Sequence, residues 1–204
     1  MKGMLKLGLV LACYAVAACV GLAFVYTATF KTIEEKTQAD LKASLKELFP
    51  DADDFPGISG AFEPEAQSVQ FKGKYEARKN GVLIGAVVEV SSASYGGAIK
   101  VLVGMGVDGR ISRIKILEHK DTPGLGANAA SPAYYVDRPT KKTFYGQFEG
   151  KSIEDRFEVK GDVTAITAST ITSRAVTTAV KAAGDAAAKW LTAQGVFISA
   201  GGSR

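Results

Sequence analysis

The sequence has almost no cysteine or histidine. Cys13 and Cys19 are the two cysteines among 204 residues, and both lie in an apolar N-terminal run, while His119 is the single histidine. The rest of the chain therefore has no disulfide and no cysteine-ligated metal or iron–sulfur site, and one histidine does not make a zinc centre or a histidine relay. We expect no metal site and no catalytic residue in this chain.

Blocks of like charge are also missing. The 25 basic and 21 acidic residues are mixed along the chain, giving a net charge of +4 without a run of five basic residues. Nucleic acid is therefore not an expected partner. The glycine clusters do not fit a Gly-x-Gly-x-x-Gly turn between a strand and a helix, which argues against NAD binding. The length suits one transmembrane segment plus one soluble domain, because domains cluster near about 100 to 150 residues.

An uncharged run covers residues 7–30. As a helix it would exceed the roughly 30 Å hydrocarbon thickness of a bilayer, so we expect a transmembrane anchor. Lys2 and Lys6 precede it without an acidic residue, which favours a cytoplasmic N-terminus. A cleaved signal peptide, or lipidation at Cys19 after Val16-Ala17-Ala18, is the alternative; the run is long for a signal peptide, and apolar residues continue beyond Cys19.

A second helix is expected directly after the anchor. Ile33, Leu41, Leu45 and Leu48 recur at helical spacing up to Pro50 and predict an amphipathic helix that packs on the domain. Residues 51–68 show no period and predict a loop. We therefore divide the chain into an anchor (1–30), a juxtamembrane helix and loop (31–68), a ligand-binding domain (69–195) and a tail (196–204).

Two hairpins predict an antiparallel sheet. Asn80-Gly81 lies within the Val- and Ile-rich segment 75–90, and Asp108-Gly109 lies between residues 99–107 and 111–117. Both dipeptides suit the positive φ angles of a type I′ turn. Residues 119–150 predict a loop-rich segment whose aromatic rings are packing residues, namely Tyr134, Tyr135, Phe144, Tyr145 and Phe148.

A C-terminal helix completes the predicted domain. Over residues 171–191 one face carries Ile171, Ala175, Val176, Ala179, Val180, Ala183 and Ala187. Paired strands with helices before and after them indicate an α+β fold. The expected architecture is one N-terminal transmembrane helix followed by a single domain with an antiparallel sheet flanked by helices.

Three segments are candidates for chemistry. Hydroxyls gather where the last helix begins, in Thr167-Ala168-Ser169-Thr170 and then Thr172 and Ser173. They suit helix capping, and they also suit a phosphate held at the helix N-terminus. The turn Asp121-Thr122-Pro123-Gly124-Leu125-Gly126 can bring backbone close to a flat ligand or be a plain surface turn. Tyr95-Gly96-Gly97 opens the second hairpin, and a bulge is the more frequent role for such a segment.

Taken in order, these segments resemble the G subunit of the Rnf electron transport complex. The resemblance rests on Tyr95-Gly96-Gly97, on the run from Leu117 through Asp121-Thr122-Pro123-Gly124-Leu125-Gly126 to Ala127, and on the run from Thr167 to Val176. In that family the last threonine of a Ser/Thr-Gly-Ala-Thr motif forms a phosphoester with FMN, attached by a flavin transferase. The matching residue is Thr170. Ala168-Ser169 replaces the usual Gly-Ala, and Thr164 stands where the family has an acidic residue.

The resemblance implies an electron-carrying subunit of a membrane-bound, ion-translocating ferredoxin:NAD oxidoreductase, with covalent FMN. Its implied partners are the other Rnf subunits, membrane lipid and the flavin transferase; the FMN domain would lie outside the cytoplasm. The residues implied to contact FMN are Thr170, Thr167, Ser169, Thr172, Ser173, Thr122, Gly124, Leu125, Gly126, Tyr95 and Gly96. Alternatives are the related C subunit of the sodium-translocating NADH:quinone reductase, a membrane-anchored scaffold module and a freestanding flavin reductase.

Overall fold

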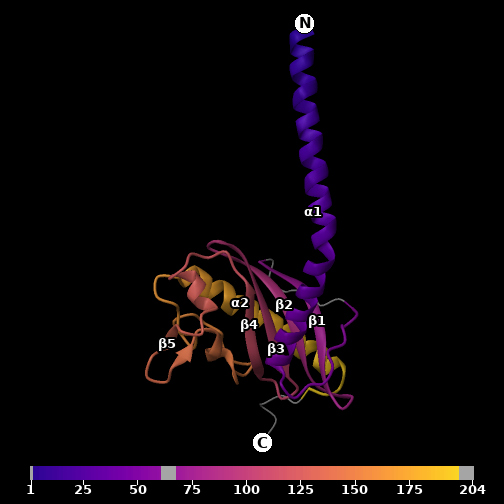
Figure 1. Cartoon of the computed structure of the whole chain (residues 1–204). Coiled ribbons are helices and arrows are strands. Elements are labelled where there is room, and N and C mark those ends of the chain that lie inside the picture. Colours follow the sequence, from indigo (N-terminus) through magenta and orange to yellow (C-terminus); the bar gives the residue numbers. More distant parts are fainter. Residues whose placement is uncertain (1, 61–67, 198–204) are drawn as a thin grey trace, which may run out of the picture. The chain divides into compact units, whose positions relative to one another are not determined.

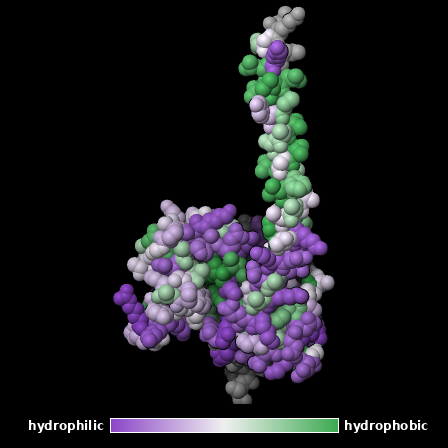
Figure 2. Space-filling view, viewed as in Figure 1, coloured by the Kyte–Doolittle hydropathy of each residue, from purple (hydrophilic) through white to green (hydrophobic). Residues whose placement is uncertain are grey.

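The computed structural model describes residues 2–60 and 68–197, which form two compact units, 1–43 and 44–204. Helix α1 (Lys2–Leu48) supplies the first unit and continues into the second. In the described part of the chain it is the one helix long and apolar enough to cross a membrane, and its apolar part is not buried within the protein. Figure 2 shows apolar side chains along this helix.

No break separates the anchor from the predicted second helix. Residues 28–36 contain neither proline nor glycine, so nothing ends α1 near residue 30, and it stops at Leu48, two residues before Pro50. Leu45 and Leu48 are buried in the second unit, whereas Ile33 is exposed. The expected packing on the domain is therefore seen at Leu45 and Leu48, while Ile33 belongs to the first unit. The predicted loop falls partly on residues 61–67, and the tail on 198–204, outside the described residues.

Four antiparallel strands form the sheet in chain order: β1 (Val69–Lys79), β2 (Val82–Ser94), β3 (Gly97–Gly106) and β4 (Ile111–Glu118). Asn80 and Gly81 both have positive φ, 50° and 80°, which confirms the first predicted turn. At the second turn only Gly109 has positive φ, at 76°, and its N–H donates to the carbonyl of Gly106 over 3.2 Å. The connection between β3 and β4 is therefore longer than the predicted two-residue type I′ turn.

Tyr95 and Gly96 form the turn between β2 and β3. Ser94 pairs with Gly97 across the ladder, so these two residues are the whole connection. The sequence-based expectation of a bulge was wrong, because β2 continues past Val90 through Ser94 and reaches this turn directly. The Tyr95 side chain is 75% exposed. The turn presents an aromatic ring at one end of the sheet.

Helix α2 (Thr170–Ala193) covers one face of the sheet, as Figure 1 shows, and confirms the α+β fold. The core between them contains Val88, Val90, Val101, Val103, Val176, Val180 and Ala183. Burying one such valine stabilises the fold by roughly 1.5 to 3 kcal/mol. On the other face, Phe49 packs against Gly85 and Gly104, where a Cβ would lie 2.5 and 3.0 Å from its ring. The domain is thus held from both faces.

The segment between β4 and α2 contains short elements: η1 (Gly126–Ala129), β5 (Tyr135–Asp137), β6 (Lys142–Thr143) and η2 (Tyr145–Phe148). Phe144 and Phe148 are fully buried and meet edge to face, with ring centroids 5.7 Å apart. Their predicted packing role is confirmed. Tyr135, by contrast, is 39% exposed. This segment carries the Thr122–Gly126 turn toward the start of α2.

Candidate functional site

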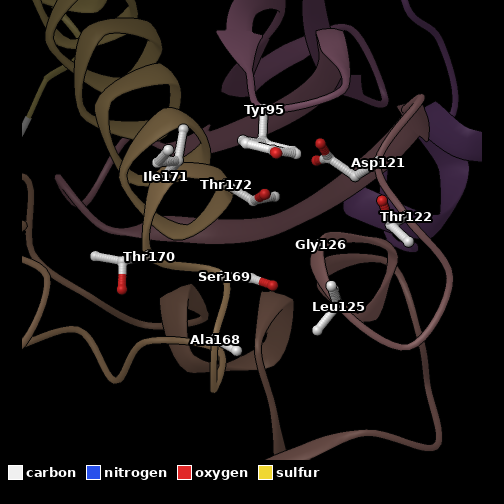
Figure 3. Close-up of a pocket in the computed structure, with 10 residues that line it drawn as sticks. All are labelled: Tyr95, Asp121, Thr122, Leu125, Gly126, Ala168, Ser169, Thr170, Ile171 and Thr172. Carbon is white, nitrogen blue, oxygen red and sulfur yellow. The ribbon is translucent and has the colours of Figure 1, made fainter.

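Three segments far apart in the sequence surround one pocket of about 450 Å³. They are the β2–β3 turn, the segment from Asp121 to Gly126, and the first turn of α2 with the residues before it (Figure 3). Its lining is Tyr95, Asp121, Thr122, Leu125, Gly126, Ala168, Ser169, Thr170, Ile171 and Thr172. The fold therefore brings together the three segments singled out in the sequence.

The N-terminus of α2 opens into this pocket without a side-chain cap. Ser169 is the N-cap residue, yet no side chain bonds to the free N–H groups there. The capping role proposed for these hydroxyls is therefore not observed, and the amides of the first turn lack intrahelical partners. Thr170 is the first residue of the helix and is half-buried. Uncapped amides and the helix dipole make this a suitable place for an anionic group.

Ser173 faces away from the pocket. Its fully buried hydroxyl donates to the carbonyl of Ser169 over 2.9 Å and accepts the N–H of Ile166 over 2.9 Å. Thr167 is exposed, its N–H donates to the Tyr134 hydroxyl over 3.2 Å, and it does not line the pocket. These two predicted contacts instead shape the chain that leads into α2.

Gly126 lets the Asp121–Gly126 segment approach α2 closely. A Cβ on Gly126 would lie 2.6 Å from the Thr172 hydroxyl oxygen and 2.7 Å from the Asp121 Cβ, so a side chain has no room. Gly124 adopts φ of 78° in the turn closed by the Leu125 N–H to the Thr122 carbonyl, 3.1 Å, but it lies outside the lining. Of this predicted turn, Thr122, Leu125 and Gly126 reach the pocket.

Asp121, Ala168 and Ile171 line the pocket although the predicted contact set omits them. Asp121 is buried and accepts the N–H of Gly96 over 2.7 Å, so Gly96 serves the turn and does not line the cavity. Ile171 was predicted on the buried face of α2 but is 56% exposed, because it lies in the first turn, before that face meets the sheet. The Asp121 motif and the small residues before Thr170 were visible in the sequence; the Ile171 contact had no such signal.

Asp162 is the nearest acidic residue before Thr170 in the sequence, and its carboxylate lies outside the pocket lining. Burial raises the pKa of Asp162, but bonds from Lys151 and from the N–H groups of Glu158 and Phe157 outweigh it and lower that pKa to about 2. Asp162 therefore closes its own turn. Among residues 2–60 and 68–197 no group of histidine, cysteine and acidic side chains is arranged to hold a metal ion.

Comparison with known proteins bears on what this pocket holds. The FMN-binding domain family matches residues 94–185, a range that includes all ten lining residues, and the RnfG N-terminal region matches residues 1–48. The chain is 34% identical over 168 residues to the G subunit of the proton-translocating ferredoxin:NAD(+) oxidoreductase complex of Clostridium ljungdahlii, covering 79% of this chain and 80% of that protein. The chain belongs to the family of Rnf complex G subunits.

Other G subunits extend the agreement. The G subunit of the Na(+)-translocating ferredoxin:NAD(+) oxidoreductase complex of Acetobacterium woodii is 34% identical over 199 residues, covering 88% of this chain and 89% of that protein. The crystal structure of Shewanella oneidensis NqrC aligns with 71% of this chain and 73% of its own, at a TM-score of 0.47 and 19% identity. The family matches and the two G-subunit relatives confirm the resemblance inferred from the three motifs.

Proposed function

We propose that this G subunit carries electrons within a membrane-bound, ion-translocating ferredoxin:NAD oxidoreductase complex, through FMN bound covalently to Thr170. The subunit names of the relatives and the FMN-binding domain match support the complex and the cofactor. The observation that carries the site assignment is the position of Thr170, half-buried at the uncapped start of α2 and on the wall of the pocket. We assign no catalytic activity to the subunit alone.

The residues present suit both ends of an FMN molecule. A phosphodiester on Thr170 carries about one negative charge, which a helix N-terminus stabilises by roughly 0.3 to 1 kcal/mol. Ser169 and Thr172 line the same wall, while Leu125 and Tyr95 present apolar and aromatic surface at the pocket. A volume of about 450 Å³ is within the usual range for cofactor pockets. Figure 3 shows the α2 residues opposite Thr122 and Leu125.

Attachment needs a partner enzyme. In this proposal the Thr170 hydroxyl oxygen would hold FMN through a phosphoester bond, and a flavin transferase would make that bond. Once bound, FMN supplies the electron-transfer chemistry, and this chain supplies position and electrostatic environment. A covalent bond keeps the cofactor in place where no FMN pool can replace it.

The apolar part of α1 supports a proposal for the membrane placement. We propose that residues 7–30 of α1 span the bilayer in contact with lipid, with Lys2 and Lys6 on the cytoplasmic side and the FMN domain, residues 69–195, on the extracytoplasmic side. The partners are the other subunits of the complex. The sequence has no NAD-binding glycine motif, so the subunit is an intermediate carrier between redox partners, not the site of NAD reduction.

Peptide mapping tests the attachment. The full-length chain is produced together with the flavin transferase, digested, and its yellow peptide sequenced by mass spectrometry. The proposal predicts the modification on Thr170. Thr167→Ala is a matched control, since Thr167 is exposed and outside the pocket lining. A flavin found on Thr167 or elsewhere would refute the assignment.

Electron transfer tests the role. In membranes that contain the whole complex, Thr170→Ala is expected to abolish ferredoxin-dependent NAD reduction while the complex still assembles. The scaffold alternative predicts unchanged electron transfer in that variant. A freestanding flavin reductase would instead oxidise NADH as the isolated subunit, and the proposal predicts that it does not.

A further inference from the structure

Asp121 connects the β2–β3 turn to the pocket. Its carboxylate accepts the N–H of Gly96 over 2.7 Å and the hydroxyl of Ser94 over 2.7 Å. Only 6% of the residue is exposed, and it lines the pocket together with Tyr95. Figure 3 shows the carboxylate directed toward the Tyr95 side of the site. One side chain therefore fixes the loop that carries the aromatic ring.

The two donors on Asp121 are neutral. Within the described ranges no lysine or arginine makes an ion pair with its carboxylate. Lys120, the next residue, is exposed and turns its aliphatic chain against Gly97, with Cδ 3.7 Å from the position of a Gly97 Cβ. A carboxylate shielded from water and not paired with a cation acts over a longer range than a solvated one. The electrostatic potential of this carboxylate therefore acts on a ligand bound in the pocket.

We propose that Asp121 is a positioning residue that also lowers the reduction potential of the flavin held in this pocket. The inference rests on the proposed function. Reduction adds electrons to the ring, and a fixed negative charge nearby disfavours the reduced form. The same carboxylate holds the Tyr95-Gly96 turn against the Asp121 segment, so closely that a Cβ on Gly96 would collide with the Lys120 carbonyl oxygen.

Asp121→Asn separates charge from packing. The asparagine amide has the same shape, its oxygen can still accept the Gly96 N–H, and the Ser94 hydroxyl can rotate to accept from its nitrogen. Ser94→Ala is the matched control, because it removes one of the two hydrogen bonds to the Asp121 carboxylate and keeps the negative charge of that carboxylate. If Asp121→Asn does not accumulate as folded protein, Asp121→Ser replaces it as a smaller neutral variant.

The test is a spectroelectrochemical titration of the full-length, flavin-loaded chain in detergent. We expect a more positive midpoint potential in Asp121→Asn and a near wild-type potential in Ser94→Ala, with the visible spectrum showing full flavin loading in both. An unchanged potential in loaded, folded Asp121→Asn overturns the inference while leaving the proposed function intact. A wild-type chain that carries no flavin overturns the proposed function itself.

Discussion

Ala168 adopts a left-handed backbone conformation, with φ of 59°, two residues before the first residue of α2. A left-handed conformation costs an L-residue roughly 1 to 2 kcal/mol, whereas glycine adopts it freely. Ala168→Gly is therefore expected to raise the stability of the domain by about 1 kcal/mol. Denaturant unfolding of the full chain in detergent measures this change.

The control for this prediction is Ala165→Gly. Ala165 lies three residues earlier, is half-buried, and has no positive φ, so glycine there brings no relief and is expected to leave stability unchanged or lower it. Equal effects from both substitutions would contradict the strain argument.

Ser173 tests which hydroxyls serve structure and which serve the ligand. Ser173→Ala removes the acceptor of the buried Ile166 N–H and is expected to destabilise the domain by about 1 to 3 kcal/mol. Flavin attachment to folded protein should persist, because Ser173 does not line the pocket. Thr178→Ala, at an exposed position five residues further along α2, should be neutral in thermal unfolding. Loss of flavin attachment in Ser173→Ala without loss of stability would show that Ser173 contributes to flavin binding.

At the scale of elements, the packing of Phe49 against the face of the sheet opposite α2 can be tested by a glycine-to-alanine substitution. A Cβ on Gly85 would lie 2.5 Å from both the Phe49 ring and the Met105 carbonyl oxygen. Gly85→Ala is expected to cost about 1 to 3 kcal/mol through overpacking, measured by thermal or denaturant unfolding. Gly57→Ala is the control, since its nearest atom lies 4.0 Å away and its φ is not positive. An unchanged free energy of unfolding in Gly85→Ala would show that Phe49 does not pack against Gly85.

Local chemistry explains which elements were predictable. Asn80-Gly81 specifies its turn because both residues tolerate positive φ, and the valine-rich strands and the alanine-rich α2 follow their periods. The end of β2 was missed because Ser91 and Ser92 interrupt the apolar pattern, although Ser92 is buried by packing that no local pattern encodes. The continuity of α1 was missed because a change in amphipathic pattern was taken for a helix end.

The candidate site also contains features that the local sequence predicts and features that only the three-dimensional fold creates. Thr170 and the Thr122–Gly126 turn could be singled out because their motifs are contiguous in sequence, and the fold brings both segments to one pocket. The inward direction of Ser173 and the clamp at Asp121 depend on how α2, the β2–β3 turn and the Asp121 segment meet in space. Ser173 does stand three and seven residues before the buried Val176 and Val180, a helical spacing that could have placed it on the core face.

At the scale of the whole molecule, the proposed orientation places the FMN domain outside the cytoplasm. Alkaline phosphatase, which is active only after export, is expected to be active when fused to the C-terminus, because Lys2 and Lys6 favour a cytoplasmic N-terminus. A green fluorescent protein fused at the same point should be dark in the same cells. Inactive phosphatase together with a fluorescent green fluorescent protein would show that the FMN domain lies in the cytoplasm. Covalent attachment would then not be explained by the absence of an FMN pool.

The mass of the intact chain, purified from membranes of cells that contain the flavin transferase, tests the central claim most directly. The wild-type chain is predicted to carry the mass of one FMN less one water, Thr170→Ser to retain it through its own hydroxyl, and Thr170→Ala to show the bare mass. A bare wild-type mass, or an FMN adduct that survives in Thr170→Ala, would contradict the account.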